Sequence, residues 1–476
     1  MPALRTILSS LLACVLAACG QEPRRPNVLL ISIDTLRPDH LSCYGYGRQT
    51  SPRIDRLAAE GVLFENHISS SSWTLPAHAA MFTSVNDSVH GCHEATGTAL
   101  SPAFTTLAER FQAAGYATGG FFAGPYLHPA FGLGQGFDDY VNCCAGGDVL
   151  DGNDVQSWAM DPTVMRASHQ GVTNETVFAA GRDWLESHRE QPFFAFVHLW
   201  DVHFDFEPPA PYDTMFDKGY EGEITGRDFF FDPRIDANLP ERDKAHLVAL
   251  YDGEIAWTDS IVGRFLDALE AWGLVEDTIV AVTSDHGTEF FEHGWKGHRT
   301  TLYDELIRIP LVIRYPRAIE AGRRVSAQTR IVDLGPTLLE LAKLAPPDDV
   351  MGASLVALAR GDTDVFPHPA ISELYSVGRR LRSVRTLESK LLDDQARESV
   401  VWFDLVSDPR ELHPSADIAT GAGREAAMRY RRATDDLAER ARRRPGDPAV
   451  PALPVEVSTQ LGALGYADDP EQDRDD

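Results

Sequence analysis

The sequence is short of positive charge. Its 476 residues include 43 lysines and arginines against 71 aspartates and glutamates, so the formal net charge is -28. This balance excludes a broad basic surface of the kind that binds nucleic acid or an anionic lipid surface. An anionic substrate would instead need a local positive centre, and bound metal ions are a simple way to supply one.

Cysteine is scarce as well, with six in the chain. Cys14 lies in the N-terminal leader and Cys19 directly after it, as described below, and the other four are Cys43, Cys92, Cys143 and Cys144. These four contain no CxxC pair, and the two adjacent cysteines lack the spacing of metal ligands, which argues against a cysteine zinc site. We interpret the four as structural residues. Disulfides can form in an exported protein, and three pairings are open.

The N-terminal apolar stretch, Ile7 to Ala18, falls short of the roughly 20 residues that a membrane-spanning helix requires. It follows Arg5 and ends in small residues, a pattern typical of a signal peptide, which we place at residues 1–18. The sequence LAAC, ending at Cys19, resembles the bacterial lipobox, in which the cysteine is acylated and becomes the mature N-terminus. We therefore expect residues 19–26 to form a lipidated cysteine and a tether. The lipid on Cys19 would attach an exported lipoprotein to the membrane, at the periplasmic face or outer membrane; an ordinary signal peptide with a chance cysteine is the alternative.

The rest of the chain divides into a long first part and a shorter second part. A chain of this length, 43% hydrophobic, has room for two or three domains, or for one large α/β domain with an appendage. Beyond Gly361 the pattern changes to short alternating runs, which favour an antiparallel sheet. We predict a catalytic domain over 27–360, a C-terminal subdomain over 361–466 and a disordered acidic tail over 467–476.

Fully apolar runs mark the predicted strands of the first part. They cover 27–33 (NVLLISI), 193–199 (FFAFVHL), 278–284 (TIVAVTS) and 310–313 (PLVI). Such runs suit the middle of a parallel sheet that is covered on both faces. Helical patterns lie between them, at 52–61, 105–115 and 246–272. Strands that alternate with helices predict a doubly wound α/β fold.

Three aspartates, Asp34, Asp201 and Asp285, each follow an apolar run at or near its end. Ligands of such sheets bind beyond the carboxyl ends of the strands, so the three carboxylates form one candidate site. A single aspartate in this position often only caps a helix. Asp285 is followed by His286 and Gly287, and a carboxylate beside an imidazole, together with a distant carboxylate, predicts an oxygen and nitrogen site for a divalent metal. The glycine allows a sharp turn there.

A polar run becomes helical at Thr74, within SSSSWTLPAHAAMFTS. Pro76 suits the first turn of a helix, so Thr74 should lie at or just before a helix N-terminus, where free N–H groups and the positive end of the dipole meet. A hydroxyl in that place can be deprotonated by a metal and act as a nucleophile. The alternative is a threonine that only caps the helix.

Taken together, these motifs resemble the sulfatase family within the alkaline-phosphatase superfamily, over nearly the whole chain. NVLLISIDTLRPDHLSCYGY resembles the metal-binding opening, TLPAHAAMFTS the nucleophile motif and TSDHGTEFFEHG the second metal segment. HLWDVHFDFEPP, HGWKGHRTTLYDELIRIPLVIR, SVRTLESKLL and WFDLVSDPREL match further family segments. The resemblance implies an alkaline-phosphatase-like α/β/α sandwich with a mostly parallel central sheet, plus a small C-terminal antiparallel-sheet subdomain.

The resemblance also implies roles for single residues. The metal ligands would be Asp34, Thr74, Asp285 and His286, with Thr74 also the nucleophile. His203 would hold the substrate anion or protonate the leaving group, and His298 is a second candidate for giving that proton. Lys296 and His298 both precede Tyr303 in the segment where the family keeps a substrate-binding lysine, and which of them takes that role is open. The other candidate substrate-binding residues are His78, which stands where many sulfatases have an arginine, and Asp201.

The expected cofactor is a divalent metal. The resemblance implies one ion of the Ca²⁺ type, whereas the nitrogen of His286 shifts the balance toward Zn²⁺ or Mn²⁺. A second metal is also open, because Asp201, His203 and His298 could supply a further ligand set.

The sequence departs from the family at two positions. Typical sulfatases oxidise a cysteine or serine to formylglycine, and Thr74 is not expected to undergo that oxidation. A plain threonine must form a covalent ester that water then hydrolyses, a route well suited to phosphorus. Thr35 replaces the second aspartate of the usual acidic pair, so one metal ligand is lost.

Three functions follow from these observations. The first is a metal-dependent hydrolase that cleaves sulfate or phosphate esters through Thr74, with a sulfated or phosphorylated glycan as one candidate substrate. The second is a transferase that passes a phosphoryl headgroup to cell-envelope glycans, and the third is a catalytically inactive binding homologue. Long aperiodic stretches at 142–171 and 212–240 are expected to select the alcohol half of the substrate.

Overall fold

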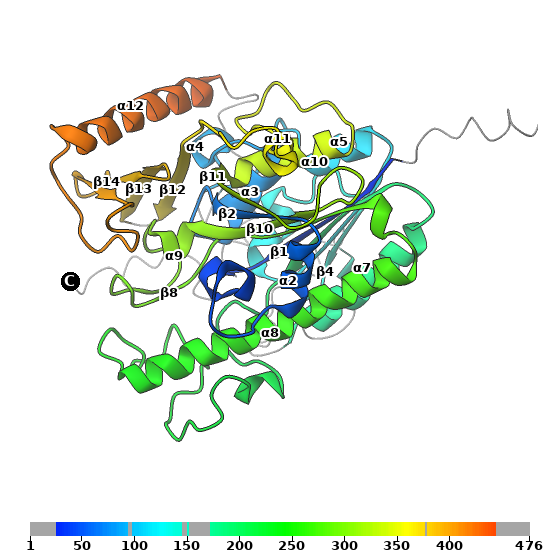
Figure 1. Ribbon diagram of the computed structural model, residues 1–476, viewed down its shortest axis with the longest axis horizontal. Coiled ribbons are helices and arrows are strands. Elements are labelled where there is room, and N and C mark those ends of the chain that lie inside the picture. The colour runs from blue at the N-terminus through cyan, green and yellow to red at the C-terminus, as the bar shows by residue number, and fades with distance from the viewer. Residues whose placement is uncertain (1–24, 94–97, 145–149, 152–171, 377, 444–476) are drawn as a thin grey trace, which may run out of the picture.

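The computed structural model describes residues 25–93, 98–144, 150–151, 172–376 and 378–443. Its centre is a nine-stranded sheet in the order β11-β2-β10-β7-β1-β6-β3-β4-β5 (Figure 1). The strands are β1 (Asn27–Ile33), β2 (Val62–Ile68), β3 (Ala117–Phe122), β4 (Asp139–Asn142), β5 (Leu150–Asp151), β6 (Phe193–Leu199), β7 (Thr278–Ser284), β10 (Arg308–Arg314) and β11 (Arg323–Arg330). Only β10 and β5 run antiparallel to their neighbours. The predicted mostly parallel sheet is confirmed.

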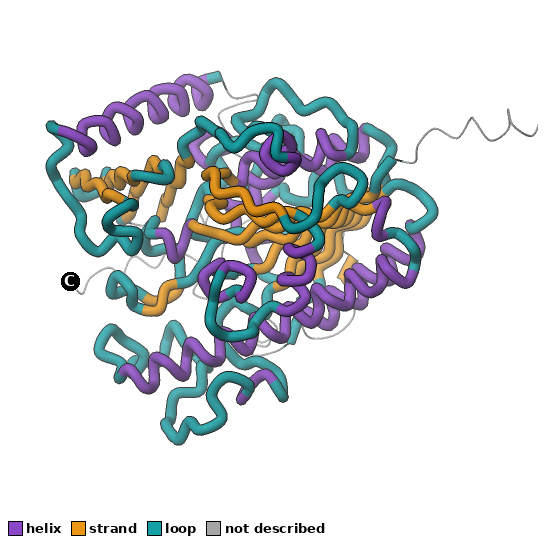
Figure 2. Tube along the Cα trace, viewed as in Figure 1, coloured by secondary structure: helices purple, strands orange, loops and turns teal. Residues whose placement is uncertain are grey.

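The apolar runs form the middle of this sheet. Every residue of β1, β6 and β7 is buried, because helices cover both faces of the sheet, and the three strands have the predicted bounds. Alternate residues of β1 enter two separate cores: Leu29 and Ile31 face one, Val28 and Leu30 the other. Figure 2 shows the strands in orange between two layers of purple helices.

Helices cover both faces. One face carries α2 (Pro52–Ala59), α7 (Asn174–His188) and α8 (Glu241–Ala271). The other carries α3 (Thr74–Thr83), α4 (Asp87–His90), α5 (Leu107–Ala113), α10 (Leu334–Leu341) and α11 (Val356–Arg360). The helical patterns at 52–61, 105–115 and 246–272 correspond to α2, α5 and α8. After α5 and α8 the chain turns at Gly115 (φ 81°) and Gly273 (φ 67°), a left-handed backbone that glycine adopts without strain.

A separate antiparallel sheet follows in the C-terminal part, as predicted. Its order is β12 (Ala370–Ser376), β13 (Arg379–Arg385), β14 (Ser389–Asp394) and β15 (Ser399–Asp404). The amphipathic α12 (Gly421–Arg442) packs on β13, β14 and α4 (Figure 1).

Short elements fill the loops around the main sheet. They are η1 (Pro38–His40), η2 (Ser42–Tyr44), η3 (Pro125–Leu127), η4 (Pro129–Phe131), η5 (Tyr212–Thr214), η6 (Val275–Asp277), η7 (Ile331–Asp333), α9 (Asp304–Ile307) and the β8 (Glu289–Phe290) and β9 (Lys296–Gly297) ribbon. Cys43, Cys92, Cys143 and Cys144 all have free thiols. Among the described helices, none is long and apolar enough to span a membrane. The leader, Cys19, the acidic tail and most of the 142–171 stretch lie outside the described residues.

Candidate active site

Two strand ends bring the first candidate ligands together. β1 and β7 pair in parallel with Ile33 opposite Ser284, so Asp34 and Asp285 emerge side by side. The Nε2 atom of His286 lies 3.7 Å from Asp34 Oδ1 and 3.4 Å from Asp285 Oδ2. All three side chains are almost completely buried. The structure therefore forms the predicted group of two carboxylates and one imidazole.

Thr74 lies at the N-terminus of α3, where the sequence placed it. Its Oγ1 atom is 3.3 Å from His286 Nε2 and 3.5 Å from Asp34 Oδ2. Trp73 precedes it in extended conformation, and no side chain caps the helix. The hydroxyl thus faces the two groups from the positive end of a helix dipole.

The C-terminal sheet fixes the segment that leads to Thr74. The Glu373 amide of β12 donates to Ser70 O at 2.7 Å, and Ser71 Oγ donates to Glu373 O at 2.7 Å. On the other side, Ser69 Oγ donates to Asp285 O at 2.5 Å. One polar run therefore ties the segment before Thr74 both to the C-terminal sheet and to the strand end that carries Asp285.

The donor set fits a divalent cation. Asp34 Oδ1 and Asp285 Oδ2 are buried and accept no hydrogen bond within the described part of the chain, an arrangement that is costly for a carboxylate without a cation. Burial raises the pKa of Asp34 to about 6. His286 Nδ1 donates to Gly287 O at 2.8 Å, which leaves the Nε2 lone pair facing both carboxylates. Lone pairs that converge in this way require positive charge between them.

Thr35 occupies the position where the family resemblance predicts the second aspartate of the acidic pair. Thr35 has a left-handed backbone (φ 52°), and its hydroxyl donates to Val202 O at 3.1 Å, away from the ligand group. Its amide donates to Asp285 Oδ1 at 3.3 Å. Thr35 therefore helps to orient the Asp285 carboxylate and does not itself face the ligand group.

Two predicted acid–base residues lie next to this group. The His298 ring is centred 4.6 Å from that of His286 and 5.0 Å from that of His203. His203 Nδ1 donates to Phe204 O at 2.6 Å, so a neutral His203 ring carries its lone pair on Nε2. Both side chains are at least nine-tenths buried. The structure brings both to the side of His286, as the sequence predicted.

Asp201 does not join the site, and that prediction is wrong. Its Oδ1 accepts the Thr173 amide at 2.7 Å and hydroxyl at 2.6 Å, and its Oδ2 accepts Trp257 Nε1 at 2.8 Å. The carboxylate also accepts the Asn174 amide at the start of α7. It is a helix-capping aspartate, so it is not available to bind substrate or to complete a second metal set with His203 and His298.

Lys296 and His78, two further candidate substrate-binding residues, bond other groups of the protein. Lys296 Nζ donates to Ile235 O at 2.6 Å, on the 212–240 stretch, and burial lowers its pKa. His78 is completely buried beneath Thr74: its Nδ1 donates to Thr74 O at 2.9 Å, and its Nε2 lies 3.1 Å from Ser32 Oγ.

His198 is a residue that the sequence analysis missed. It is the only polar side chain of β6 and pairs in register with Ser32. Its Nε2 lies 3.5 Å from Asp34 Oδ2. A signal existed, because side chains alternate along strands: Ser32 and Asp34 share a face, and a histidine opposite Ser32 must share it too.

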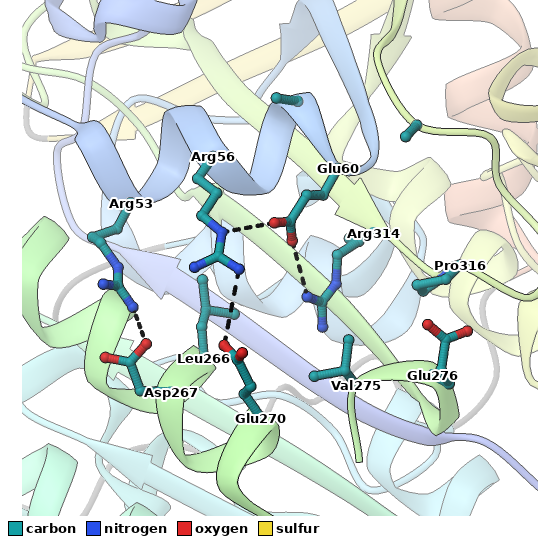
Figure 3. Close-up of a pocket in the computed structure, with 12 residues that line it drawn as sticks. Arg53, Arg56, Glu60, Leu266, Asp267, Glu270, Val275, Glu276, Arg314 and Pro316 are labelled. Carbon is teal, nitrogen blue, oxygen red and sulfur yellow. Dashed lines mark hydrogen bonds and ion pairs between the residues drawn. The ribbon is translucent and has the colours of Figure 1, made fainter. Parts of the chain in front are cut away.

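A separate cavity of about 520 Å³ lies elsewhere, between α2, the end of α8 and the end of β10 (Figure 3). Three arginines line it: Arg53 pairs with Asp267, Arg56 with both Glu60 and Glu270, and Arg314 with Glu60. Because Arg314 is in register with Val280 on β7, this cavity opens at the amino ends of the parallel strands. It is therefore at the opposite edge of the sheet from Asp34.

Comparison with known proteins identifies the family. The sulfatase family model matches residues 26–344. This chain belongs to the sulfatase family. A second family model, for the C-terminal part of N-sulphoglucosamine sulphohydrolase, matches residues 291–428 of this sulfatase. The family generally depends on a divalent metal, which agrees with the buried donor set.

Curated relatives are similar over most of their length. An N-acetylglucosamine-6-O-sulfatase of Bacteroides thetaiotaomicron is 26% identical, with 86% of each chain covered. An arylsulfatase of Clostridium perfringens is 26% identical, covering 82% of this sulfatase and 89% of the relative. This sulfatase is therefore an enzyme, a hydrolase of the sulfatase type.

Solved structures confirm the fold. A structure in complex with its substrate D-glucosamine-2-N,6-O-disulfate superposes with a TM-score of 0.71 at 20% identity, covering 87% of this sulfatase and 99% of that chain. The phosphonate monoester hydrolase of Agrobacterium radiobacter superposes with a TM-score of 0.68 at 24% identity, covering 88% and 96%.

Proposed function

We propose that this sulfatase cleaves sulfate esters of glycans through Thr74, with phosphate esters as the second candidate class. The observation that carries the proposal is the position of the Thr74 hydroxyl. It lies at the N-terminus of α3, within 3.5 Å of both Asp34 Oδ2 and His286 Nε2. A hydroxyl beside a fitted cation site and a helix dipole is placed to act as a nucleophile.

Asp34, Asp285, His286 and Thr74 would hold the divalent cation, which supplies positive charge that favours the Thr74 alkoxide and the anionic ester. Thr74 Oγ1 then forms a bond to sulfur or phosphorus as the bond to the leaving alcohol oxygen breaks. His203 or His298 would accept the proton that Thr74 releases and give it to that oxygen. Water next attacks the same sulfur or phosphorus, the bond to Thr74 Oγ1 breaks, and a proton of that water passes to Thr74 as the inorganic anion is released.

Aromatic rings support a sugar as the alcohol half. Phe204 lies 5.4 Å from His298 and stacks on Phe230 at 5.5 Å, and Phe231 beyond it is 63% exposed. Phe230 and Phe231 belong to the 212–240 stretch. A line of rings from a histidine to the surface suits the flat apolar face of a sugar or aryl group. The relatives favour the sugar, since one of them is named an N-acetylglucosamine-6-O-sulfatase.

Two observations favour different ester classes. Family membership supports sulfate esters, whereas a threonine without formylglycine suits phosphorus. The relatives favour neither the headgroup transferase nor the inactive binding protein.

The test is a parallel assay of 4-nitrophenyl sulfate, 4-nitrophenyl phosphate and a bis-aryl phosphodiester, with metal content measured on the same sample. We expect turnover of at least one ester by the wild type, none by Thr74→Ala and partial turnover by Thr74→Ser. Full turnover by Thr74→Ala would reject the nucleophile.

We further propose export as a lipoprotein through Cys19, on the evidence of the LAAC sequence. In a bacterial host, Cys19→Ala should move the protein from the membrane fraction to the soluble fraction. An unchanged distribution would reject the anchor.

A further inference from the structure

A second group of possible metal ligands lies beneath the first. It consists of His78 from α3, His198 from β6 and Asp285, and one ligand atom of each lies within 4.8 Å of the others. All three side chains have no exposed surface. Asp285 belongs to both groups, so it connects the two.

His198 presents a lone pair to this group. Its Nδ1 donates to Ala123 O at 2.9 Å, which leaves Nε2 as the acceptor of a neutral ring. Nε2 is buried, has no hydrogen-bond partner among the described residues and lies 3.5 Å from Asp34 Oδ2, also an acceptor. Two acceptors that face each other away from solvent need a cation or a proton between them.

Asp285 offers the bridging atom. Its Oδ2 accepts no hydrogen bond from the described residues and lies 3.4 Å from His286 Nε2 and 3.6 Å from His78 Nδ1. It therefore faces an imidazole of each group. A carboxylate that faces two nitrogen donors in this way is suited to bridge two cations.

His78 can supply the third ligand by a change of tautomer. Its Nε2 lies 3.1 Å from Ser32 Oγ, and a hydroxyl can either donate to that nitrogen or accept from it. With the proton on Nε2 and donated to Ser32, Nδ1 carries a lone pair 3.6 Å from Asp285 Oδ2. The bond from Nδ1 to Thr74 O at 2.9 Å is then lost, and the His78 ring must turn so that the lone pair faces Asp285 instead of Thr74 O.

We propose that His78, His198 and Asp285 bind a second divalent cation, with Zn²⁺ preferred over Ca²⁺. Two imidazole nitrogens and one carboxylate are a typical zinc donor set, whereas calcium takes oxygen ligands. The proposal rests on the proposed active site, since Asp285 is shared. A second cation there would offset the charge of two carboxylates, an alkoxide and an anionic ester, a task that Lys296 cannot perform while it donates to Ile235.

The test counts zinc in full-length protein that has been stripped with a chelator, re-equilibrated with Zn²⁺ and measured by plasma mass spectrometry. We expect about two ions per chain in the wild type and about one in His198→Gln. His67→Gln is the matched control, because His67 on β2 is also buried, bonds Thr329 through Nδ1 and has no partner for Nε2 among the residues that the structure describes. That control should keep about two.

Anomalous diffraction at the zinc edge locates the ions and keeps the test valid if His198→Gln folds poorly. A wild-type peak at His198 Nε2 supports the proposal. A single zinc per chain, no peak at His198, or an unchanged count in folded His198→Gln would overturn it and leave a proton between His198 and Asp34. Thr74→Ala separates the two claims: turnover by this variant rejects the proposed nucleophile but does not alter the zinc count at His198.

Discussion

Asp34 should destabilise the metal-free enzyme at neutral pH. Burial raises its pKa from 3.8 to about 6, so folding disfavours the ionised form. A pKa difference of one corresponds to about 1.4 kcal/mol, and the whole difference therefore costs about 3 kcal/mol above pH 7. Because folding raises the pKa of Asp34, the contribution of Asp34 to stability is most favourable below the unfolded pKa of 3.8. That contribution is lost as the pH rises through the folded pKa of about 6. At pH 5 about half of the cost should be recovered.

Asp34→Asn removes this charge. In the presence of chelator at pH 8 we expect the variant to be more stable than the wild type by up to about 3 kcal/mol, with the difference shrinking toward pH 5. Urea unfolding followed by circular dichroism measures both proteins. With Zn²⁺ added, the order should reverse, because only the wild type keeps the ligand. An Asp34→Asn protein that is less stable than wild type under chelation at pH 8 would refute the account of an uncompensated buried carboxylate.

Three further variants test other parts of the structure. Phe231→Ala should raise KM about tenfold for aryl and sugar esters but not for a methyl ester, whereas Val406→Ala, at another exposed apolar position after β15, should leave KM unchanged; equal KM values for the two variants would show that the Phe231 ring does not contact the alcohol half of the substrate. Asp201→Ala should lower the free energy of unfolding by about 3 kcal/mol in denaturant titrations because several buried donors lose their acceptor; loss of turnover without loss of stability would instead restore a substrate role. Ser71→Ala removes the hydrogen bond to Glu373 O and should lower the free energy of unfolding by about 1 kcal/mol and also lower kcat. An unchanged kcat would show that the contact with the C-terminal sheet does not position Thr74.

The central strands could be predicted from the sequence because their burial is complete. A run such as NVLLISI has no face of charged residues that must reach solvent, so the whole run can be buried. The strands β1, β6 and β7 have the predicted bounds. The C-terminal strands were predicted less exactly, since the alternating pattern beyond Gly361 gave no strand bounds, and the segment SVRTLESKLL contains the turn between β13 and β14. Alternation identifies a half-exposed sheet but does not mark where one strand ends.

Strand ends explain both the success and the failure at the site. Asp34, Asp201 and Asp285 look alike in sequence, and two of them meet because β1 and β7 are neighbours. Asp201 differs because Thr173, 28 residues earlier, brings the N-terminus of α7 to its carboxylate. Local sequence carries no trace of that long-range contact, so only the structure distinguishes a cap from a ligand.

His198 shows the reverse case. Its surroundings follow from the pairing of β1 with β6, and one histidine in an apolar strand is a visible signal. The strand order that makes it meaningful is a property of the folded sheet.

The central claim is that Thr74 becomes covalently linked to the substrate anion. The most direct measurement is acid quenching of the metal-loaded enzyme during turnover of a slow aryl ester, followed by peptide mass spectrometry. The account predicts a sulfuryl or phosphoryl group on Thr74 that disappears when substrate is exhausted and is absent from Thr74→Ala. An unmodified Thr74 throughout the burst of product release, or an adduct on another residue, would contradict it.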